Sequence, residues 1–198
     1  MRTIDVNYIG VKSMLEHMRD KNPNATFLYM SSSEIYGSPT ADNFPTQETY
    51  QGNVSVTNNR ACYMESKRLA EVLCLAYANN HNMKIRIARP ALSYGPGLTF
   101  EGGRVISQFM SKAYHDKAIN MVDDGRDLRS FCYMSDVTHE LLSILLHAKD
   151  IIYNVGSSEE EISVLELANL VGGIMNVPVT PGPGKDANVI GAPSRVLL

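Results

Sequence analysis

Two short apolar segments of this sequence flank one long segment with helical periodicity, and this order constrains the fold more than any other feature. The short segments are "TFLYM" (26–30) and "KIRIAR" (84–89), and "RACYMESKRLAEVLCLAYA" (60–78) lies between them. Leucine and valine recur at helical spacing in the long segment, whereas the short segments have the character of strands. Strand, helix and strand in this order predict an α/β fold with a parallel sheet.

Further elements are predicted on both sides of this unit. Before it, apolar residues at helical spacing predict an amphipathic helix over 4–20, which ends at "KNPN". Within it, the polar stretch 37–59 is expected to form a loop. Beyond "YGPG" (94–97) the elements become shorter, so we expect a second, smaller lobe to begin there.

The second half of the chain is predicted to contain short elements joined by turns. We expect a helix near 105–115, a pair of strands around the "DDGRD" turn (123–127) and a helix after Ser135. The stretch "SVLE" (163–166) has the pattern of a capping box, in which the serine hydroxyl accepts a hydrogen bond from the amide of the glutamate. A further helix is therefore expected to begin at this point.

The composition limits the partners that we expect. Of the 198 residues, 44% are hydrophobic and 20% are charged, and the net charge of -3 gives no general attraction to nucleic acid or to an anionic membrane. No apolar run approaches the roughly 18 residues that a membrane-spanning helix needs. The three cysteines and five histidines have no metal-ligand spacing, which favours reduced thiols and no metal site. We expect a cytoplasmic protein that binds small solutes.

Tyr63 and Lys67 are the first candidates for chemistry. They lie four residues apart in the predicted helix 60–78, so both side chains project from one face, about 5–6 Å apart at Cβ. A nearby ammonium stabilises a tyrosinate, and a tyrosinate is a usable base. The same spacing also occurs in surface pairs of tyrosine and lysine that carry out no chemistry, and the spacing alone leaves both readings open.

The stretch "YMSSSEIYG" (29–37) places three serines and an acid directly after a predicted strand. The carboxyl ends of parallel strands open on one side of a sheet, where ligands bind. We therefore expect Ser32, Ser33 and Glu34 to lie at the same edge as the pair on the helix. In the alternative interpretation the serines only cap the strand and the carboxylate is solvated.

Taken together, these motifs resemble the extended short-chain dehydrogenase/reductases, and among them the NAD-dependent sugar-nucleotide epimerases, dehydratases and decarboxylases. The resemblance covers essentially all 198 residues and includes "ARPALSYGPG" (88–97) and "LRSFCYMSD" (128–136). The phrases "RACYMESKRLAE" (60–71) and "EGGRVISQF" (101–109) are most similar to UDP-glucuronate decarboxylases.

The resemblance also implies a domain organisation. Residues 1–95 are expected to form the remainder of an NAD-binding, Rossmann-like, doubly wound parallel sheet. Residues 96–198 are expected to form mainly a smaller α/β lobe that binds the substrate, interleaved with the last strands of the sheet.

A role for each motif residue in hydride chemistry follows from the resemblance. Tyr63, with help from Lys67, takes the proton of the sugar 4-hydroxyl while hydride leaves C4 for NAD, and Ser32 holds that hydroxyl. Glu34, beside Arg129, is implied to handle a glucuronate and its enolate.

The remaining site residues implied by the resemblance bind substrate or cofactor. Ser33, Arg104 and Arg129 are assigned to the substrate, the last to a phosphate or carboxylate, and Asn7 is assigned to the neighbourhood of the cofactor, as are the tyrosine and lysine of the helix.

The resemblance favours some of the related reactions over others but leaves decarboxylation, 4-epimerisation and 4,6-dehydration all open. Related dehydratases have an aspartate where this chain has Ser33, which argues against 4,6-dehydration, and a 4-epimerase needs neither that acid nor Glu34. The family's asparagine after the arginine of "ARP" is replaced by Leu92. An apolar side chain cannot replace the hydrogen bonds of an amide, so the sequence leaves the exact nucleotide sugar open.

One family feature is missing from the sequence. No strand, G-x-x-G-x-x-G turn and helix precede the first predicted helix, although that turn holds the NAD pyrophosphate. We therefore expect a fragment or a truncated reading frame, with little or no turnover by this polypeptide alone. The alternative is a non-catalytic remnant that binds a sugar nucleotide or serves in assembly. A bared sheet edge is a template for another chain, so we also expect a homodimer or other self-association.

Overall fold

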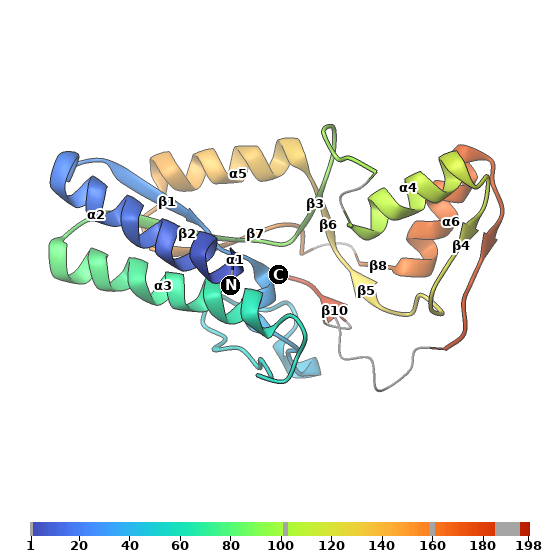
Figure 1. Cartoon of the computed structure of the whole chain (residues 1–198), viewed down its shortest axis with the longest axis horizontal. Helices are drawn as coiled ribbons and strands as arrows, with labels where there is room; N and C mark the ends of the chain where they lie inside the picture. Colours follow the sequence, from blue (N-terminus) through green and yellow to red (C-terminus); the bar gives the residue numbers. More distant parts are fainter. Residues whose placement is uncertain (1, 101–102, 159–160, 185–194) are drawn as a thin grey trace.

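The computed structural model describes residues 2–100, 103–158, 161–184 and 195–198 (Figure 1). Residues 101–102 of the predicted substrate-side segment therefore lie outside the described residues. The helices are α1 (Arg2–Ile4), α2 (Val11–Lys21), α3 (Ala61–His81), α4 (Val105–His115), α5 (Met134–His147) and α6 (Val164–Met175), with a π-helical segment at Asp5–Gly10 and 3-10 helices at Ser33–Tyr36 and Ala41–Asn43. The strands are β1 (Thr26–Met30), β2 (Lys84–Pro90), β3 (Leu92–Tyr94), β4 (Ile119–Asn120), β5 (Leu128–Arg129), β6 (Phe131–Tyr133), β7 (Ile152–Val155), β8 (Ile162–Ser163), β9 (Val179–Thr180) and β10 (Arg195–Val196).

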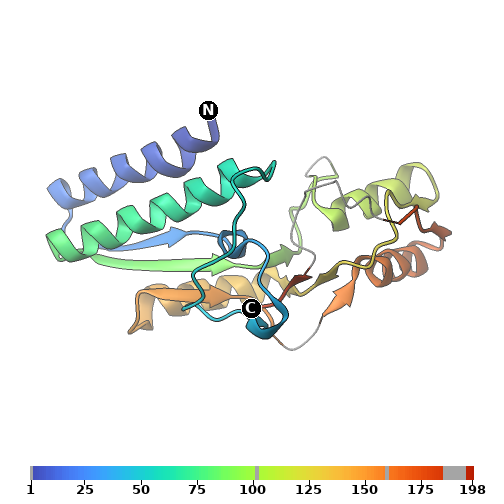
Figure 2. The same cartoon turned by 90° about the horizontal axis from the view of Figure 1, so that it is seen from below.

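A three-stranded parallel sheet with the order β1, β2, β7 forms the centre of the first lobe. The strands β1 and β2 are in register from Thr26↔Lys84 to Met30↔Ala88, and β2 continues beside β7 to Pro90↔Val155. Helices α2 and α3 lie on one face of this sheet and α5 lies on the other (Figure 2). The predicted α/β class with a parallel, Rossmann-like sheet is confirmed.

The two faces of β2 explain why the helices pack there. Ile85 and Ile87 point to the α3 side and are almost fully buried with Leu15 of α2 and Cys74 of α3. Ala88 points to the opposite side and packs in a second cluster with residues of α5 and β7. Burying each large aliphatic side chain is worth about 1.5–3 kcal/mol, so alternation along this strand attaches a helical layer to each face.

Several predicted elements agree closely with the structure. The segment "TFLYM" is β1, the helix predicted at 105–115 is α4, and the helix after Ser135 is α5. The N-terminal helical stretch covers 2–21 and contains a π-helical segment that its apolar pattern does not reveal. The helix predicted over 60–78 continues to His81, because a left-handed residue that ends it occurs only at the next position.

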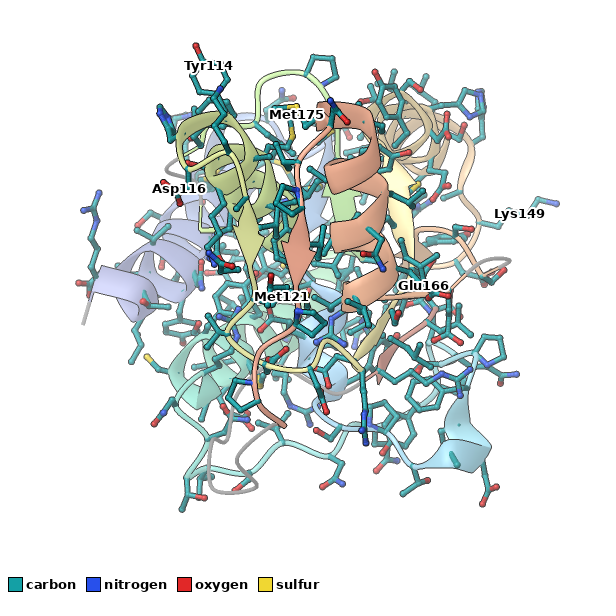
Figure 3. All side chains as sticks on the ribbon, turned by 90° about the vertical axis from the view of Figure 1, so that its right-hand side faces the viewer. Tyr114, Asp116, Met121, Lys149, Glu166 and Met175 are labelled. Carbon is teal, nitrogen blue, oxygen red and sulfur yellow. The ribbon has the colours of Figure 1, made fainter. Side chains whose placement is uncertain are left out.

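The smaller lobe packs α4 and α6 around short strands. Figure 3 views the molecule from the side of this lobe, with Glu166 and Met175 towards the two ends of α6. Phe109, Ile119 and Leu167 are buried in its own apolar cluster. The predicted capping box is confirmed, since the Ser163 hydroxyl accepts from the amide of Glu166 at 3.1 Å and the Glu166 carboxylate accepts from the amide of Ser163 at 2.7 Å.

The predicted pair of strands around "DDGRD" is wrong. Strands β4 and β5 flank this turn, but β4 pairs with β9, and β5 lies between β8 and β10. In a hairpin, β4 and β5 would form hydrogen bonds with each other; here their backbone groups bond to segments that are distant in sequence. The amide of Leu165 donates to the Gly125 carbonyl oxygen at 3.0 Å, and the amide of Val164 donates to the Asp127 carbonyl oxygen at 3.0 Å.

The last residues of the chain connect the two lobes. The Val196 carbonyl oxygen accepts from the amide of Ser130 at 3.1 Å, and the Leu197 carbonyl oxygen accepts from the amide of Thr46 at 3.0 Å. Leu198 packs in an apolar cluster beside the 3-10 helix that follows β1. Across the described part of the chain, no helix has both the length and the hydropathy that crossing a membrane requires.

Candidate active site

The carboxyl end of β1 turns directly into a 3-10 helix. The amide of Ser31 still donates to the Ala88 carbonyl oxygen at 2.7 Å, which extends the contact with β2 by one residue. Ser32 then caps the helix Ser33–Tyr36, and its Oγ accepts from the amide of Glu34 at 3.2 Å. The cap uses only an oxygen lone pair, so the hydroxyl proton of Ser32 can still be donated to a ligand.

Glu34 is held by an arginine that the sequence analysis did not single out. Arg60, the residue before α3, donates from Nε to one carboxylate oxygen of Glu34 at 2.8 Å and from Nη2 to the other. The hydrogen bond to Glu34 raises the pKa of Arg60. The side chain of Glu34 is 23% exposed, so it is not freely solvated. Burial lowers the pKa of Arg129, the arginine beside which the sequence predicted Glu34, and the negative charge of Glu34 opposes this effect.

Tyr63 and Lys67 occupy neighbouring turns of α3, next to the end of β1. The Lys67 ammonium donates to the Met30 carbonyl oxygen at 2.7 Å and lies 5.2 Å from the centroid of the Tyr29 ring. Burial lowers the pKa of Lys67, and the negative charge of Glu71 acts in the opposite direction. Lys67 thus attaches α3 to the last residue of the strand and retains two further N–H donors.

The geometry brings four predicted residues to one place. Lys67 contacts the strand end two residues before Ser32, and the guanidinium of Arg60, which holds Glu34, lies 5.8 Å from the centroid of the Tyr63 ring. We call Ser32, Glu34, Tyr63 and Lys67 the β1-edge set. Within the described residues, no hydrogen bond joins the Tyr63 hydroxyl to the Lys67 ammonium.

Asn7 reaches the same helix from the π-helical segment. Its Nδ2 donates to the Oγ of Ser66 at 3.0 Å, and that hydroxyl donates to the Tyr63 carbonyl oxygen at 2.9 Å. Ser66 is 4% exposed, so Asn7 supports the backbone of α3 at a buried point. Its assignment to the cofactor stays a prediction.

The two arginines assigned to the substrate contact their own neighbourhoods. Arg129 is 8% exposed and donates to the Asp127 carboxylate at 3.1 Å; burial lowers its pKa, and the carboxylate opposes this effect. Arg104 is exposed, precedes α4 and donates to the Ser93 carbonyl oxygen at 3.0 Å. Ser33 lines a small cavity together with residues of the last strand, including Arg195. Ser33 adjoins Ser32 and Glu34 in the chain, and the negative charge of Glu34 acts on the pKa of Arg129. Among the described residues, Arg104 has no hydrogen bond to the β1-edge set.

Three charged residues near the site escaped the sequence analysis. Arg60 pairs with Glu34, and Glu71 pairs with Arg89 in the interior, where both side chains are 7% exposed. A usable signal was present, because Glu71 follows Lys67 by four residues and therefore shares its helix face. A charge on the face that packs against the sheet requires a buried partner.

Solved structures establish the class of fold. The chain superposes on a UDP-glucose 4-epimerase from Thermotoga maritima with a TM-score of 0.85 and 21% identity, over 98% of this chain and 60% of that one. It superposes on a dTDP-glucose 4,6-dehydratase from Bacillus anthracis in complex with NAD with a TM-score of 0.79 and 23% identity, over 98% and 59% of the two chains. These likenesses define a Rossmann-type α/β protein.

The family follows from sequence. Residues 1–156 match the model of the NAD dependent epimerase/dehydratase family, and the chain belongs to this family. UDP-glucuronic acid decarboxylase 6 of Arabidopsis thaliana is 37% identical over 86% of this chain and 48% of its own length, and UDP-glucuronic acid decarboxylase 1 of Danio rerio is 34% identical over 86% and 40%. The chain thus spans about half the length, or less, of the curated relatives it matches.

The donors at the strand end fit a dinucleotide. Lys67 offers two unused N–H groups, and Tyr63, a half-buried residue, offers its hydroxyl. A sugar diol such as a ribose accepts hydrogen bonds from such donors. The family uses NAD by its description. The glycine-rich turn that would bind the pyrophosphate does not occur in the 198 residues.

Proposed function

We propose that this chain provides the catalytic residues of an NAD-dependent sugar-nucleotide enzyme that oxidises C4 of its sugar transiently, most similar to a UDP-glucuronate decarboxylase. The gathering of the β1-edge set at the carboxyl end of a parallel strand supports this proposal most directly. The similarity to UDP-glucuronic acid decarboxylases supports the substrate class.

Each member of the set has a task that its position permits. The Tyr63 oxygen would take the proton of the sugar 4-hydroxyl, while the ammonium of Lys67 stabilises the resulting phenolate. Ser32, whose hydroxyl proton is not used by its cap, would donate to the same sugar oxygen. NAD, when bound, supplies the acceptor for the C4 hydride.

The pair of Glu34 and Arg60 is the reason that we prefer decarboxylation to 4-epimerisation and 4,6-dehydration. A 4-keto sugar acid loses carbon dioxide when the bond between C5 and C6 breaks and its electron pair passes to an enolate, which then takes a proton at C5. This step requires no acid to protonate a leaving hydroxyl. A carboxylate that a guanidinium holds through both oxygens fits this decarboxylation step, because the two hydrogen bonds fix its position beside the sugar.

The in-family alternatives differ in what they require at this edge. A 4-epimerase would need the proton and hydride steps but no role for Glu34, and epimerases are among the proteins with the same fold. A 4,6-dehydratase would need an acid where this chain has Ser33. From another class, a non-catalytic protein that binds a sugar nucleotide or serves in assembly would keep the β1-edge set without turnover. The domain boundary at residues 95/96, NAD binding and a cytoplasmic location are part of the proposal.

A second copy of the chain is the macromolecular partner that we propose. Helices α1 and α2 and the π-helical segment Asp5–Gly10 form one continuous helical stretch, which lies beside α3 on the outer face of the sheet (Figure 2). This stretch and α3 expose large apolar side chains. Val6 is 62% exposed, Met14 59% and Val72 62%. Covering such side chains in a dimer would remove them from water.

Calorimetric titration of the purified chain with NAD, UDP-glucuronate and UDP-xylose tests the proposed function. We expect UDP-glucuronate to bind in the micromolar range and Tyr63→Phe to leave that binding nearly unchanged, since the phenol oxygen acts in the reaction. NAD is expected to bind weakly to these 198 residues, because they contain no glycine-rich turn. An assay of carbon dioxide release then separates decarboxylation from epimerisation. Absence of any sugar-nucleotide binding would contradict the proposal for this chain.

A further inference from the structure

A buried arginine on the central strand contacts both halves of the candidate site. Arg89 on β2 is 6% exposed, and its Nε and Nη2 donate to the two carboxylate oxygens of Glu71 at 3.0 and 2.7 Å. Its Nη1 donates to the Tyr36 hydroxyl at 2.8 Å and to the Glu48 carbonyl oxygen at 2.9 Å. Four of the five N–H groups of this guanidinium therefore have partners within the protein.

The partners of Arg89 belong to different halves of the site. Tyr36 is the last residue of the 3-10 helix that follows Ser32 at the end of β1. Glu71 lies four residues after Lys67 on α3, and these two side chains share one face of the helix. Arg89 itself lies on β2, between the two elements.

The contacts of Tyr36 extend this arrangement to the loop before α3 and to β7. The Tyr36 hydroxyl donates to Oδ1 of Asn154 at 2.7 Å. The side-chain amide of Asn154 donates to the Thr46 carbonyl oxygen at 2.7 Å, and its backbone amide donates to the Glu48 carboxylate at 2.8 Å. The 3-10 helix is thus fixed on two sides by directional hydrogen bonds.

Stability alone does not account for a buried pair of this kind. Replacing a buried ion pair by apolar side chains of similar volume is often neutral or stabilising, because the desolvation cost of two charges is large. A bidentate guanidinium–carboxylate pair does supply a fixed geometry, which apolar packing supplies less strictly. Although burial acts against the cation, hydrogen bonds and charges of Glu71 and Tyr36 raise the pKa of Arg89.

We propose that Arg89, Glu71 and Tyr36 form a positioning hub that holds the two halves of the β1-edge set in a fixed relative place. One half is the 3-10 turn with its serine cap, and the other is the face of α3 with its tyrosine and lysine. The inference rests on the proposed function only in taking the β1-edge set as the catalytic set. The hub residues themselves are positioning residues.

The hub also acts on Lys67 through charge. The groups that act on this ammonium are the Tyr29 ring and the Met30 carbonyl oxygen from β1 and the Glu71 carboxylate from its own helix. Glu71 supports the charged form of Lys67. Anything that displaces the carboxylate of Glu71 should therefore change the titration of this lysine.

The first test is the substitution Tyr36→Phe, which removes one hydroxyl and keeps every charge. Tyr50→Phe is the matched control, because the ring of Tyr50 lies 6.2 Å from that of Tyr36 in the same apolar cluster and its hydroxyl is outside the hub. The NMR signals of the Glu34 amide and the Lys67 ammonium are recorded for both variants. We expect Tyr36→Phe to shift both signals and Tyr50→Phe to shift neither.

The second test is the substitution Glu71→Gln, with Glu65→Gln as control on the exposed part of the same helix. Glu65 is 46% exposed and pairs with Arg68 at 3.5 Å. We expect Glu71→Gln to lower the measured pKa of Lys67, because it removes the charge that supports the ammonium, and Glu65→Gln to leave it unchanged. Tyr36→Phe decides the question by itself where Glu71→Gln does not fold.

Equal effects of each variant and its control would overturn the hub. A change at Tyr36 that stays within its own apolar cluster, with Glu34 and Lys67 unmoved, would overturn it as well. None of these measurements needs NAD or a sugar nucleotide. A failure of the chain to bind these ligands would therefore count against the proposed function and not against the hub.

Discussion

The two lobes of the molecule relate to their sequence in different ways. In the first lobe, Ser32 follows its strand and Lys67 follows Tyr63 by one helical turn, and the fold brings these residues to a single edge. In the second lobe, Arg129 lies in a short strand whose partners come from distant parts of the chain, and it contacts Asp127. The difference shows that local spacing groups the candidate residues within each element of the first lobe, whereas pairing between distant segments determines the environment of the second lobe.

The largest effect is expected at the buried pair of the first lobe. Glu71→Ala leaves Arg89 charged and unpaired in the interior, so we expect a loss of about 3–5 kcal/mol in the free energy of unfolding. Glu65→Ala removes an exposed charge from the same helix and should cost about 0–1 kcal/mol. Urea denaturation followed by circular dichroism measures both. Equal losses would mean that the interior tolerates the unpaired arginine.

Substitutions in the cores of the two lobes show whether each lobe unfolds independently of the other. Ile87 and Ile119 are both fully buried, one in each lobe, and each change to alanine should cost about 2–5 kcal/mol. Native-state hydrogen exchange shows which lobe each substitution destabilises. We expect each substitution to speed exchange mainly in its own lobe, because the clusters around the two residues are separate. Uniform acceleration by both variants would show that the lobes unfold as one unit.

A smaller effect is expected at the capping box of α6. Ser163→Ala removes the acceptor for the Glu166 amide, and we expect a loss of about 0.5–2 kcal/mol. Ser163→Asp restores an acceptor and should recover most of it. Thermal unfolding of the three proteins provides the comparison. A neutral Ser163→Ala would mean that the tertiary contacts of the second lobe, and not its local signals, fix the start of this helix.

The smallest effect concerns the pH dependence contributed by Lys67. Its pKa is lowered in the folded protein chiefly by burial, so the unfolded chain binds this proton more readily. The contribution to stability therefore rises with pH between the lowered pKa and the ordinary lysine value of about 10.4. The difference in unfolding free energy between wild type and Lys67→Met should increase across that range in favour of wild type. A difference that is flat or falling with pH would contradict the direction of the shift.

The features that could be predicted from the sequence are those that depend on residues close together in the chain. Helical and strand periodicity located β1, α3 and α4, and a four-residue spacing put Tyr63 and Lys67 on one face. The pairing of Glu34 with Arg60 spans 26 residues, and no local pattern indicates it. The strand pair predicted around the DDGRD turn is wrong for the same reason, since carbonyl groups of the turn accept hydrogen bonds from the start of α6 and from Gly182.

Mapping the binding of UDP-glucuronate by NMR tests the central claim most directly, which is that the β1-edge set forms a sugar-nucleotide site. The amide of Glu34, the ring of Tyr63 and the ammonium of Lys67 are followed while the ligand is added to the 198-residue chain. The account predicts that these three signals shift together with one dissociation constant. Shifts confined to the second lobe, or no shift at saturating ligand, would contradict it.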